Sequence, residues 1–289
     1  MLPKRPFGST GIDVSILGLG TVKLGRDQGV KYPNSFTIPT DREAFNLLAL
    51  AQDLGINLID TAPAYGNSEE RLGTLLNGQR EQWIICSKVG EEFQAGQSHF
   101  DFSPEHVRFS VERSLKRLNS EMIDIVLVHS DGNDEKIIRE YGTLEALAQL
   151  KTEGKIRASG MSTKTVKGGL LAAEQSDAIM VTWNLQYDQE VPVIDYCHRH
   201  NKGVLIKKAL ASGHVEQTTN EDPVQQSFEM IFGHPGVSSA IVGTINPEHL
   251  KDNISKHWPL RHRGLSQSTL LAAILSSLTF PGFSPQLPW

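Results

Sequence analysis

Four ionisable side chains have types and spacings that could carry out proton transfer. Asp60 ends the apolar run NLID, and Tyr65 follows five positions later in a turn-prone segment. Lys88 ends the run WIICSK, and His129 ends the run IDIVLVH. One charged residue at the end of an apolar run is common and mostly structural. Four on successive units are poorly explained by chance, so we interpret them as one candidate catalytic set.

This set predicts a site that hands a proton to a reduced carbonyl oxygen. A free tyrosine has a pKa of about 10, and a nearby ammonium lowers that pKa. We expect Lys88 to supply this ammonium and Asp60 to keep Lys88 charged and oriented. A shift of ~3 units requires ~4 kcal/mol of differential interaction. His129 would donate a hydrogen bond that orients and polarises a carbonyl. Since no redox-active residue or metal set is evident, a hydride-donating cofactor is the natural complement.

The elements that must position these residues form a regular series. Eight strand-like runs alternate with helical patterns: 15–20, 57–60, 83–88, 123–129, 156–162, 178–183, 203–208 and 238–243. Apolar strands separated by helices are typical of a parallel sheet covered by helices. Eight units in succession favour a closed (β/α)8 TIM barrel, whose active site lies at the C-terminal face of the strands. The four candidate side chains would meet at that face.

Helix boundaries and connections agree with this reading. Thr40 and Gly55 have the residue types of an N-cap and a C′ position, and Ser103 and Asn246 each precede a proline at a helix start. Two long connections, 23–40 and 89–103, follow predicted strand ends and are interpreted as loops at the catalytic face. No linker divides the chain, so we predict a single domain over 1–289, with an atypical tail at 258–289.

The segments LIDTAPAYGNSEERLG, ICSKVG, IDIVLVHS, GKIRASGMS and VGTINPEHLKDN resemble the signature segments of the aldo-keto reductase superfamily. The resemblance runs in order from residue 8 to about residue 257. It implies NAD(P)H-dependent reduction of aldehydes or ketones on a (β/α)8 barrel, or oxidation of the corresponding alcohols or sugars. It also implies that Asp60, Tyr65, Lys88 and His129 are the catalytic tetrad, with Tyr65 as general acid or base.

The resemblance assigns a further set of positions to the cofactor. These are Gly20, Thr21, Asp60, Ser162, Thr163, Asn184, Lys207, Leu210, Ser212, Gly243, Thr244, Asn246, His249 and Asn253. Lys207 stands where many members stack an aromatic ring on the nicotinamide, and a lysine cannot stack in that way. Gly243 and His249 stand where NADP-preferring members often carry Lys and Arg. On family habit we expect NADP(H), with NAD(H) as the alternative.

The composition and charge of the chain limit the kinds of partner that it is expected to bind. A formal net charge of −5 with scattered Lys and Arg gives no basic footprint for nucleic acid. The start lacks an apolar core of signal-peptide length, and the apolar segment 270–278 is about half of a bilayer span. Two cysteines make no disulfide framework. We therefore expect a cytoplasmic protein, monomeric or a small homo-oligomer, that acts on a small molecule without a membrane. We expect no metal site, because the side chains of CHRH (197–200) point different ways on a helix.

Two other functions compete with this interpretation. The first is a regulatory subunit that senses nicotinamide redox state through a reductase fold, with slow turnover. The second is a Schiff-base barrel enzyme with Lys88 as nucleophile. The tail does not resemble the family's usual ending, which often shapes the substrate pocket, so the substrate is left open.

Overall fold

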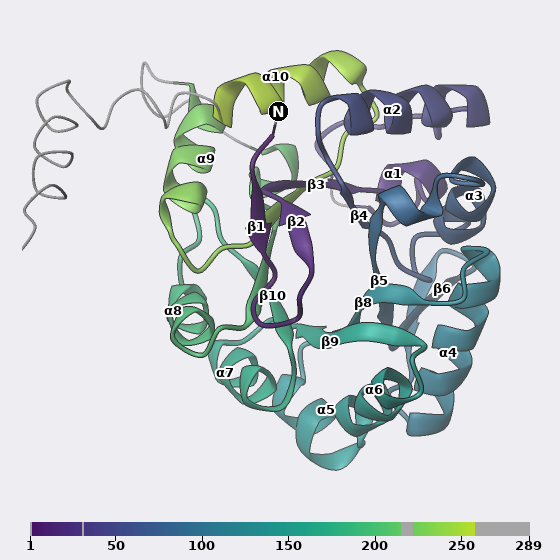
Figure 1. Cartoon of the computed structure of the whole chain (residues 1–289), viewed down its shortest axis with the longest axis vertical. Coiled ribbons are helices and arrows are strands. Elements are labelled where there is room, and N and C mark those ends of the chain that lie inside the picture. Colours follow the sequence, from purple (N-terminus) through teal and green to yellow (C-terminus); the bar gives the residue numbers. More distant parts are fainter. Residues whose placement is uncertain (1, 31, 215–221, 258–289) are drawn as a thin grey trace, which may run out of the picture.

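Eight parallel strands close into a barrel that helices surround (Figure 1). The computed structural model describes residues 2–30, 32–214 and 222–257. In order around the barrel the strands are β10 (Ala178–Thr182), β11 (Gly203–Lys207), β12 (Ser239–Val242), β3 (Leu17–Gly20), β4 (Leu58–Asp60), β5 (Ile84–Val89), β8 (Ile123–His129) and β9 (Ile156–Ser162). Each strand lies within one of the eight predicted runs, apart from a single residue at the end of β5. The predicted (β/α)8 barrel is confirmed.

Helices follow the strands along the chain. They are α1 (Val22–Gly25), α2 (Asp41–Asp53), α3 (Ser68–Leu75), α4 (Pro104–Arg117), α5 (Asp134–Glu140), α6 (Thr143–Thr152), α7 (Val166–Gln175), α8 (Val191–Arg199), α9 (Pro223–Gly233) and α10 (Pro247–His257), with two short 3-10 turns at Arg80–Gln82 and Ala211–Gly213. The predicted caps are confirmed. Thr40 and Glu43 form a capping box at α2, and the Ser103 hydroxyl accepts from His106 N at α4. Asn246 Oδ1 accepts from Glu248 N at α10.

The apolar core divides into two parts because strand side chains alternate between the faces of the barrel wall. The larger cluster lies between strands and helices and includes Ile59, Ile85 and Val126. The smaller cluster includes alternate residues of the same strands, such as Leu58 and Ile125, together with Phe7 from the N-terminal segment. The barrel interior is therefore filled with side chains, as in other barrels of this size.

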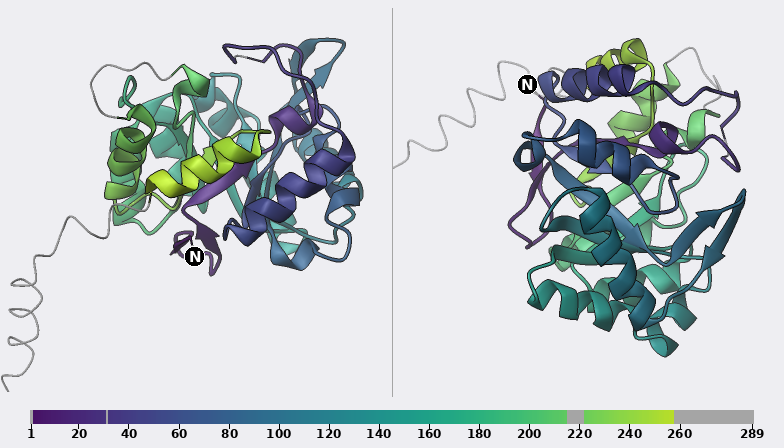
Figure 2. Two further views of the ribbon diagram at one scale, coloured as in Figure 1. Left: turned by 90° about the horizontal axis from the view of Figure 1, so that it is seen from above. Right: turned by 90° about the vertical axis from the view of Figure 1, so that its right-hand side faces the viewer.

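An N-terminal hairpin closes the end of the barrel from which the strands begin. Its strands β1 (Lys4–Pro6) and β2 (Asp13–Ser15) pair antiparallel, and the fully buried Phe7 packs between them and the interior cluster. A Cβ at Gly203 would lie 2.6 Å from the Phe7 ring, so only glycine lets β11 pass this closely. Figure 2 shows this hairpin at one end of the molecule and the hairpin that follows β5 at the other.

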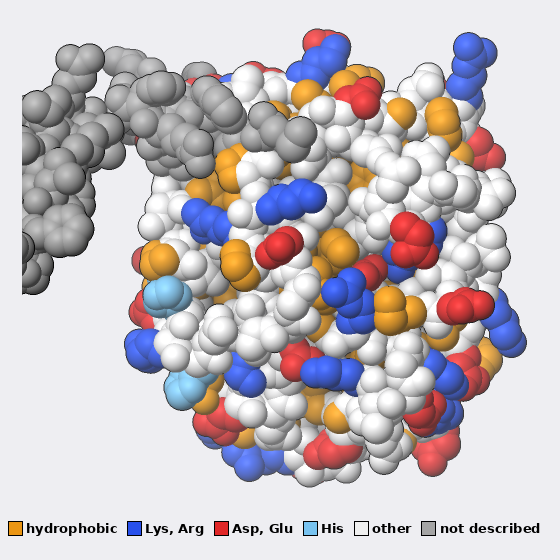
Figure 3. Space-filling model, in the orientation of Figure 1, with side chains coloured by type: hydrophobic (Ala, Val, Ile, Leu, Met, Phe, Trp, Pro, Cys, Tyr) orange, Lys and Arg blue, Asp and Glu red, His pale blue; other side chains and the backbone are white. Residues whose placement is uncertain are grey.

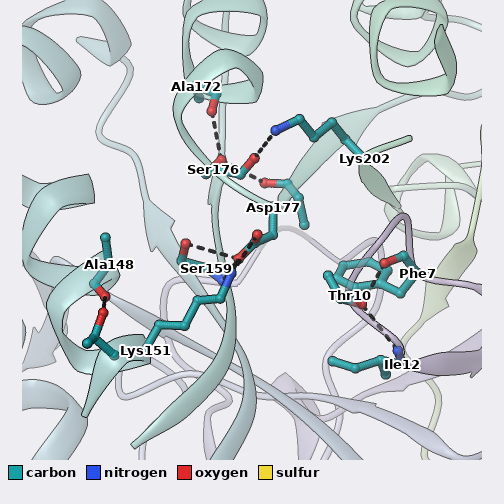
Figure 4. A network of polar contacts seen from close by, with 12 residues as sticks. Phe7, Thr10, Ile12, Ala148, Lys151, Ser159, Ala172, Ser176, Asp177 and Lys202 are labelled. Atoms are coloured by element: carbon teal, nitrogen blue, oxygen red, sulfur yellow. Dashed lines mark hydrogen bonds and ion pairs between the residues drawn. The ribbon is translucent and has the colours of Figure 1, made fainter. Parts of the chain in front are cut away.

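Polar contacts brace the connection between β9 and β10 (Figure 4). The Asp177 carboxylate accepts from Lys151 Nζ at 2.7 Å and from Ser159 N at 2.9 Å. Lys202 Nζ donates to Ser176 O at 2.8 Å. These bonds satisfy polar groups where α6, α7 and the strand ends meet, so they hold the strand register on which the opposite face depends.

One of the two long connections is not a loop. Residues 89–103 contain the antiparallel hairpin β6 (Glu91–Gln94) and β7 (Gln97–Phe100), with Glu91 opposite Phe100. The prediction of a loop here is wrong, because the polar run EEFQ and QSHF has no apolar alternation to reveal strands. The turn Ala95–Gly96 has positive φ at both residues, as a tight hairpin turn requires.

The surface mixes charges of both signs. Acidic and basic side chains are interspersed over the face in Figure 3, which is viewed in the orientation of Figure 1. Among the described residues, no helix combines the length and apolar character needed to cross a bilayer. The predicted atypical tail, 258–289, lies outside the described residues.

Candidate active site

Asp60 and Lys88 form a buried ion pair at the C-terminal ends of β4 and β5. Lys88 Nζ lies 2.7 Å from Asp60 Oδ1 and donates to Thr61 O at 2.8 Å. Lys88 is 2% exposed and Asp60 is 4% exposed. The two strands are neighbours in the barrel, which is why their ends bring the residues together. Burial makes each charge depend on the other for compensation.

The segment that carries Tyr65 is fixed by its own hydrogen bonds. Tyr65 N donates to Ala62 O at 3.0 Å, and Ser68 N donates to Tyr65 O at 3.2 Å. Gly66 has a φ of 61°, and a Cβ at this position would collide with Gly25 O. The chain after β4 must therefore turn tightly against α1, and glycine is the residue that allows this approach.

Tyr65 lies beside both Lys88 and His129. Lys88 Nζ is 4.9 Å from the centroid of the Tyr65 ring. The Tyr65 and His129 rings meet edge to face, with centroids 6.3 Å apart and an interplanar angle of 87°. The structure thus brings together all four residues that the sequence singled out, on the face where barrel enzymes place their sites.

The expectation that the pKa of Tyr65 is lowered is wrong. Burial raises the pKa of Tyr65 above its ordinary value, and Asp60 adds to this increase. Lys88 pulls the pKa of Tyr65 downward, as expected, but burial is the larger effect. The phenol is therefore protonated at neutral pH, which is the state that a proton donor needs.

Lys88 is a charged ammonium and not a free amine. Burial would lower the pKa of Lys88, but the attraction of the Asp60 carboxylate, the largest opposing effect, raises it above its ordinary value. An amine must lose its proton before it can attack a carbonyl. The Schiff-base alternative therefore lacks its nucleophile at neutral pH.

Glu91, which the sequence interpretation missed, lies against His129. Glu91 Oε2 is 2.8 Å from His129 Nδ1, although the N–H direction is poorly aligned for a hydrogen bond. Burial lowers the pKa of His129, while Glu91 acts in the opposite direction. The available signal was the position of Glu91, just beyond the end of β5 on the catalytic face.

Arg26 joins three neighbouring connections around the same site. It follows α1, donates to Ala64 O at 3.0 Å, and stacks on Phe93 of β6 at 3.4 Å from the ring centroid. It also lies 3.9 Å from Glu91 Oε1. Arg26 therefore ties the segment after β3, the Tyr65 segment and the β6–β7 hairpin together.

Comparison with known proteins decides the family. Residues 16–231, well over half of the chain, match the model of the Aldo/keto reductase family. The chain belongs to this family. The resemblance on which the tetrad was proposed is thereby confirmed.

Relatives of this aldo-keto reductase include solved and curated proteins. A crystal structure of a Pseudomonas aeruginosa protein named as an aldo-keto reductase is 59% identical, with a TM-score of 0.80, over 88% of this chain and 93% of that chain. The oxidoreductase YqkF of Bacillus subtilis is 27% identical over 87% of this chain and 90% of its own length. The NADH-specific methylglyoxal reductase of Escherichia coli is 35% identical over 55% of this chain and 51% of its own length.

This aldo-keto reductase is an oxidoreductase of a family that uses nicotinamide cofactors.

Several residues assigned to the cofactor gather at the ends of β9, β10 and β11. Lys207 Nζ donates to Ser162 Oγ at 2.9 Å and to Thr163 O at 2.6 Å. Asn184 Nδ2 donates to Lys208 O at 3.1 Å. Among the described residues nothing bonds to the buried Thr163 Oγ1. The Ser162 hydroxyl and the Asn184 amide fit a group that both donates and accepts, such as a carboxamide, whereas Thr163 is fully buried and its side chain is not presented at the mouth.

Thr21, Gly20 and Gly243, which were also assigned to the cofactor, differ in how accessible they are to a ligand. Thr21 is fully buried and its hydroxyl donates to Asp60 O at 2.9 Å, so its side chain fixes the tetrad and is not exposed to the mouth. Gly20 and Gly243 face each other across β3 and β12, and a Cβ at Gly243 would lie 3.3 Å from the Tyr32 hydroxyl. A Cβ at Gly20 would lie 3.1 Å from Ile241, whereas Gly243 is exposed, so the backbone at Gly243 is the part that a ligand can approach.

The remaining assigned residues lie in two separate segments. Leu210 and Ser212 belong to the turn after β11, where Ser212 has a φ of 58°. Thr244, Asn246, His249 and Asn253 lie at and along α10. The side chains of Thr244 and Asn246 already accept the local backbone N–H groups of Asn246 and Glu248. Since Pro247 has no N–H, few backbone donors at the start of this helix are left for an anion.

Proposed function

We propose that this enzyme reduces aldehydes or ketones by hydride transfer from NAD(P)H, or oxidises the corresponding alcohols or sugars, with Tyr65 as general acid or base. The observation that carries the proposal is the buried Asp60–Lys88 pair, with its ammonium 4.9 Å from the Tyr65 ring centroid. No structural requirement of the barrel calls for a phenol beside such a pair.

Each residue of the tetrad has a part in the proposed mechanism. The nicotinamide, when bound, supplies the hydride. Tyr65 donates its proton to the oxygen of the reduced carbonyl, and the positive Lys88 stabilises the phenolate that results. Asp60 keeps Lys88 charged and holds its ammonium near Tyr65. His129 orients the carbonyl oxygen by a hydrogen bond from its imidazole. Oxidation of an alcohol reverses these proton transfers.

Steady-state turnover with a panel of sugars, short aldehydes and aromatic ketones tests the proposal. We expect hydride transfer to at least one class, detected as cofactor absorbance lost with substrate. Cofactor binding without turnover of any member of the panel would overturn the proposal and favour the redox-sensing regulatory subunit. Size-exclusion chromatography tests the accompanying proposal of a monomer or small homo-oligomer, and cell fractionation tests the proposed cytoplasmic location.

The proposal takes NADP(H) as the first candidate cofactor and NAD(H) as the second. The positive end of the α10 dipole favours an anion such as a 2′-phosphate, although the N–H groups of Asn246 and Glu248 already donate to side chains. Glu248, in the first turn of the same helix, acts against that anion and favours NAD(H). The relative that reduces methylglyoxal is named as NADH-specific. Fluorescence quenching titrations with NADPH and NADH decide between the two.

We expect Lys207 to make the affinity for the oxidised cofactor depend on pH. Burial lowers the pKa of Lys207 to about 8, against the attraction of Glu190. Below that pH a positive charge stands at the corner with Ser162, and it repels an oxidised nicotinamide, which is itself positive. We therefore expect NAD(P)⁺ to bind more tightly, relative to NAD(P)H, as pH rises through about 8.

The comparison of the two redox forms isolates this effect. Both forms carry the same phosphates, so the ratio of their dissociation constants reports the ring charge. In Lys207→Met we expect that ratio to be flat between pH 7 and pH 9, while Lys167→Met, which removes an exposed ammonium paired with Glu135, keeps the wild-type curve. A wild-type ratio that does not change with pH would refute the role given to Lys207.

A further inference from the structure

The His129 imidazole has two nitrogens on opposite edges of its ring, and one of them is already engaged. Nδ1 faces Glu91 Oε2 at 2.8 Å. Nε2 makes none of the hydrogen bonds found among the described residues. The ring nitrogen opposite Glu91 is therefore the one left for a ligand. Glu91 belongs to β6, so this contact comes from an added hairpin and not from the barrel strands.

The Glu91 carboxylate is itself held from two sides. Ser98 Oγ of the paired strand β7 donates to Oε1 at 2.6 Å, and the Arg26 guanidinium lies 3.9 Å from the same oxygen. The Glu91 side chain is 12% exposed. Burial would raise the pKa of Glu91, but His129, Ser98 and Arg26 lower it to about 2. Glu91 is therefore an anion throughout the pH range in which enzymes work.

The neighbouring Glu92 contacts α4 and does not contact His129. Its carboxylate contacts Arg113 Nη2 at 2.5 Å and His106 Nε2 at 3.2 Å, both on α4. Since successive residues of a strand point to opposite faces, Glu92 anchors the hairpin to α4 while Glu91 faces His129. The hairpin thus offers a matched pair of acidic residues, only one of which touches the tetrad.

We propose that Glu91 is a positioning residue for the reaction: its carboxylate engages His129 Nδ1, stabilises the imidazolium and leaves Nε2–H to donate to the reacting carbonyl oxygen. The inference rests on the proposed function and deepens it. A nitrogen that faces a carboxylate holds a proton, so His129 can donate from Nε2 only when both nitrogens are protonated. Because the Nδ1–H bond is poorly aligned with the carboxylate, Glu91 stabilises the imidazolium mainly through its negative charge and less through a directed hydrogen bond.

The other charges around His129 determine the sign of the effect. Lys88 and Lys207 both disfavour the imidazolium, and burial acts in the same direction. Glu91 supplies the opposing negative charge, and the neighbouring Tyr65 is neutral below its raised pKa. Loss of the Glu91 charge therefore lowers the pKa of His129 further. The imidazolium then survives only at lower pH.

Glu91→Gln tests the proposal because it removes the charge and keeps the shape. We expect the alkaline limb of the kcat/KM profile for carbonyl reduction to move to lower pH by about 1 unit, and kcat/KM on that limb to fall about 10-fold. The same shift should be visible when His129 is titrated by ¹⁵N NMR, with no substrate present. Glu92→Gln, the matched control on the same hairpin, should leave both curves unchanged. Ser98→Ala, which keeps the charge but removes its anchor, should give a smaller shift in the same direction.

The outcomes separate this inference from the function on which it rests. If Glu91→Gln gives the same NMR titration and the same pH profile as Glu92→Gln, Glu91 has no positioning role. If Tyr65→Phe retains full turnover, the proposed function fails, and the NMR titration still reports whether Glu91 acts on His129. If Glu91→Gln does not fold, Glu91→Ala, which also removes the charge, decides, and an unshifted His129 titration in that variant overturns the proposal.

Discussion

Replacement of Tyr65 by phenylalanine is expected to reduce kcat for carbonyl reduction by about 10³-fold, because a positioned general acid contributes a factor of that order. Phenylalanine keeps the ring that packs edge to face against His129 and removes the hydroxyl alone. Cofactor affinity, measured by fluorescence quenching, is expected to be unchanged. The decrease should therefore appear in kcat and not in cofactor binding.

Tyr141→Phe is the matched control for this experiment. Tyr141 is 39% exposed and packs against Phe102, away from the tetrad. Its loss of a hydroxyl should leave turnover at the wild-type level. Undiminished turnover in Tyr65→Phe would instead remove Tyr65 from the role of acid, and with it the proposed mechanism.

Lys88→Met is expected to lower the free energy of unfolding by roughly 3–5 kcal/mol, because it leaves the Asp60 carboxylate buried without a counter-charge. Urea denaturation followed by circular dichroism measures this loss. The double variant Asp60→Asn with Lys88→Met removes both charges and should recover much of the stability, since the cost lies in the unpaired charge. Neither variant should turn over a carbonyl, because both lack the ammonium beside Tyr65.

The surface pair Lys151–Asp177 provides a control with the same N···O distance and different burial. Lys151 Nζ lies 2.7 Å from Asp177 Oδ2, the distance found between Lys88 Nζ and Asp60 Oδ1, but the Lys151 side chain is 42% exposed. Lys151→Met should cost no more than about 1 kcal/mol, as is typical of exposed pairs. Equal losses in the two lysine variants would contradict the argument from burial.

The barrel and the proximity of the four candidate residues could be predicted from the sequence because both depend on local patterns. Apolar runs separated by capped helices predict a (β/α)8 barrel, and in that fold the ends of neighbouring strands share one rim. The positions of Asp60 and Lys88 at strand ends therefore implied their proximity. The caps at Thr40, Ser103 and Asn246 were equally local, since each depends on residues within three positions.

Interactions between segments far apart in the sequence could not be predicted in the same way. Glu91 contacts His129 only because β6 and β7 pair, and their polar sequences carry no strand signal. The direction of the pKa of Tyr65 depends on how much protein surrounds the phenol, which spacing does not reveal. Lys207 was recognised as a departure from the family, but its bonds to Ser162 and Thr163 depend on the packing of β11 near β9 across β10.

The N-terminal hairpin has a consequence for the order of events in a catalytic cycle. Phe7 and its neighbours cover one end of a barrel whose interior is filled with side chains, so in the proposed reaction both reactants would reach the tetrad from the opposite end. The reactant that binds deeper in the site must then bind first, and the product formed from it must dissociate last. Product inhibition should accordingly be competitive against one reactant only, as expected for a compulsory sequence of entry and exit.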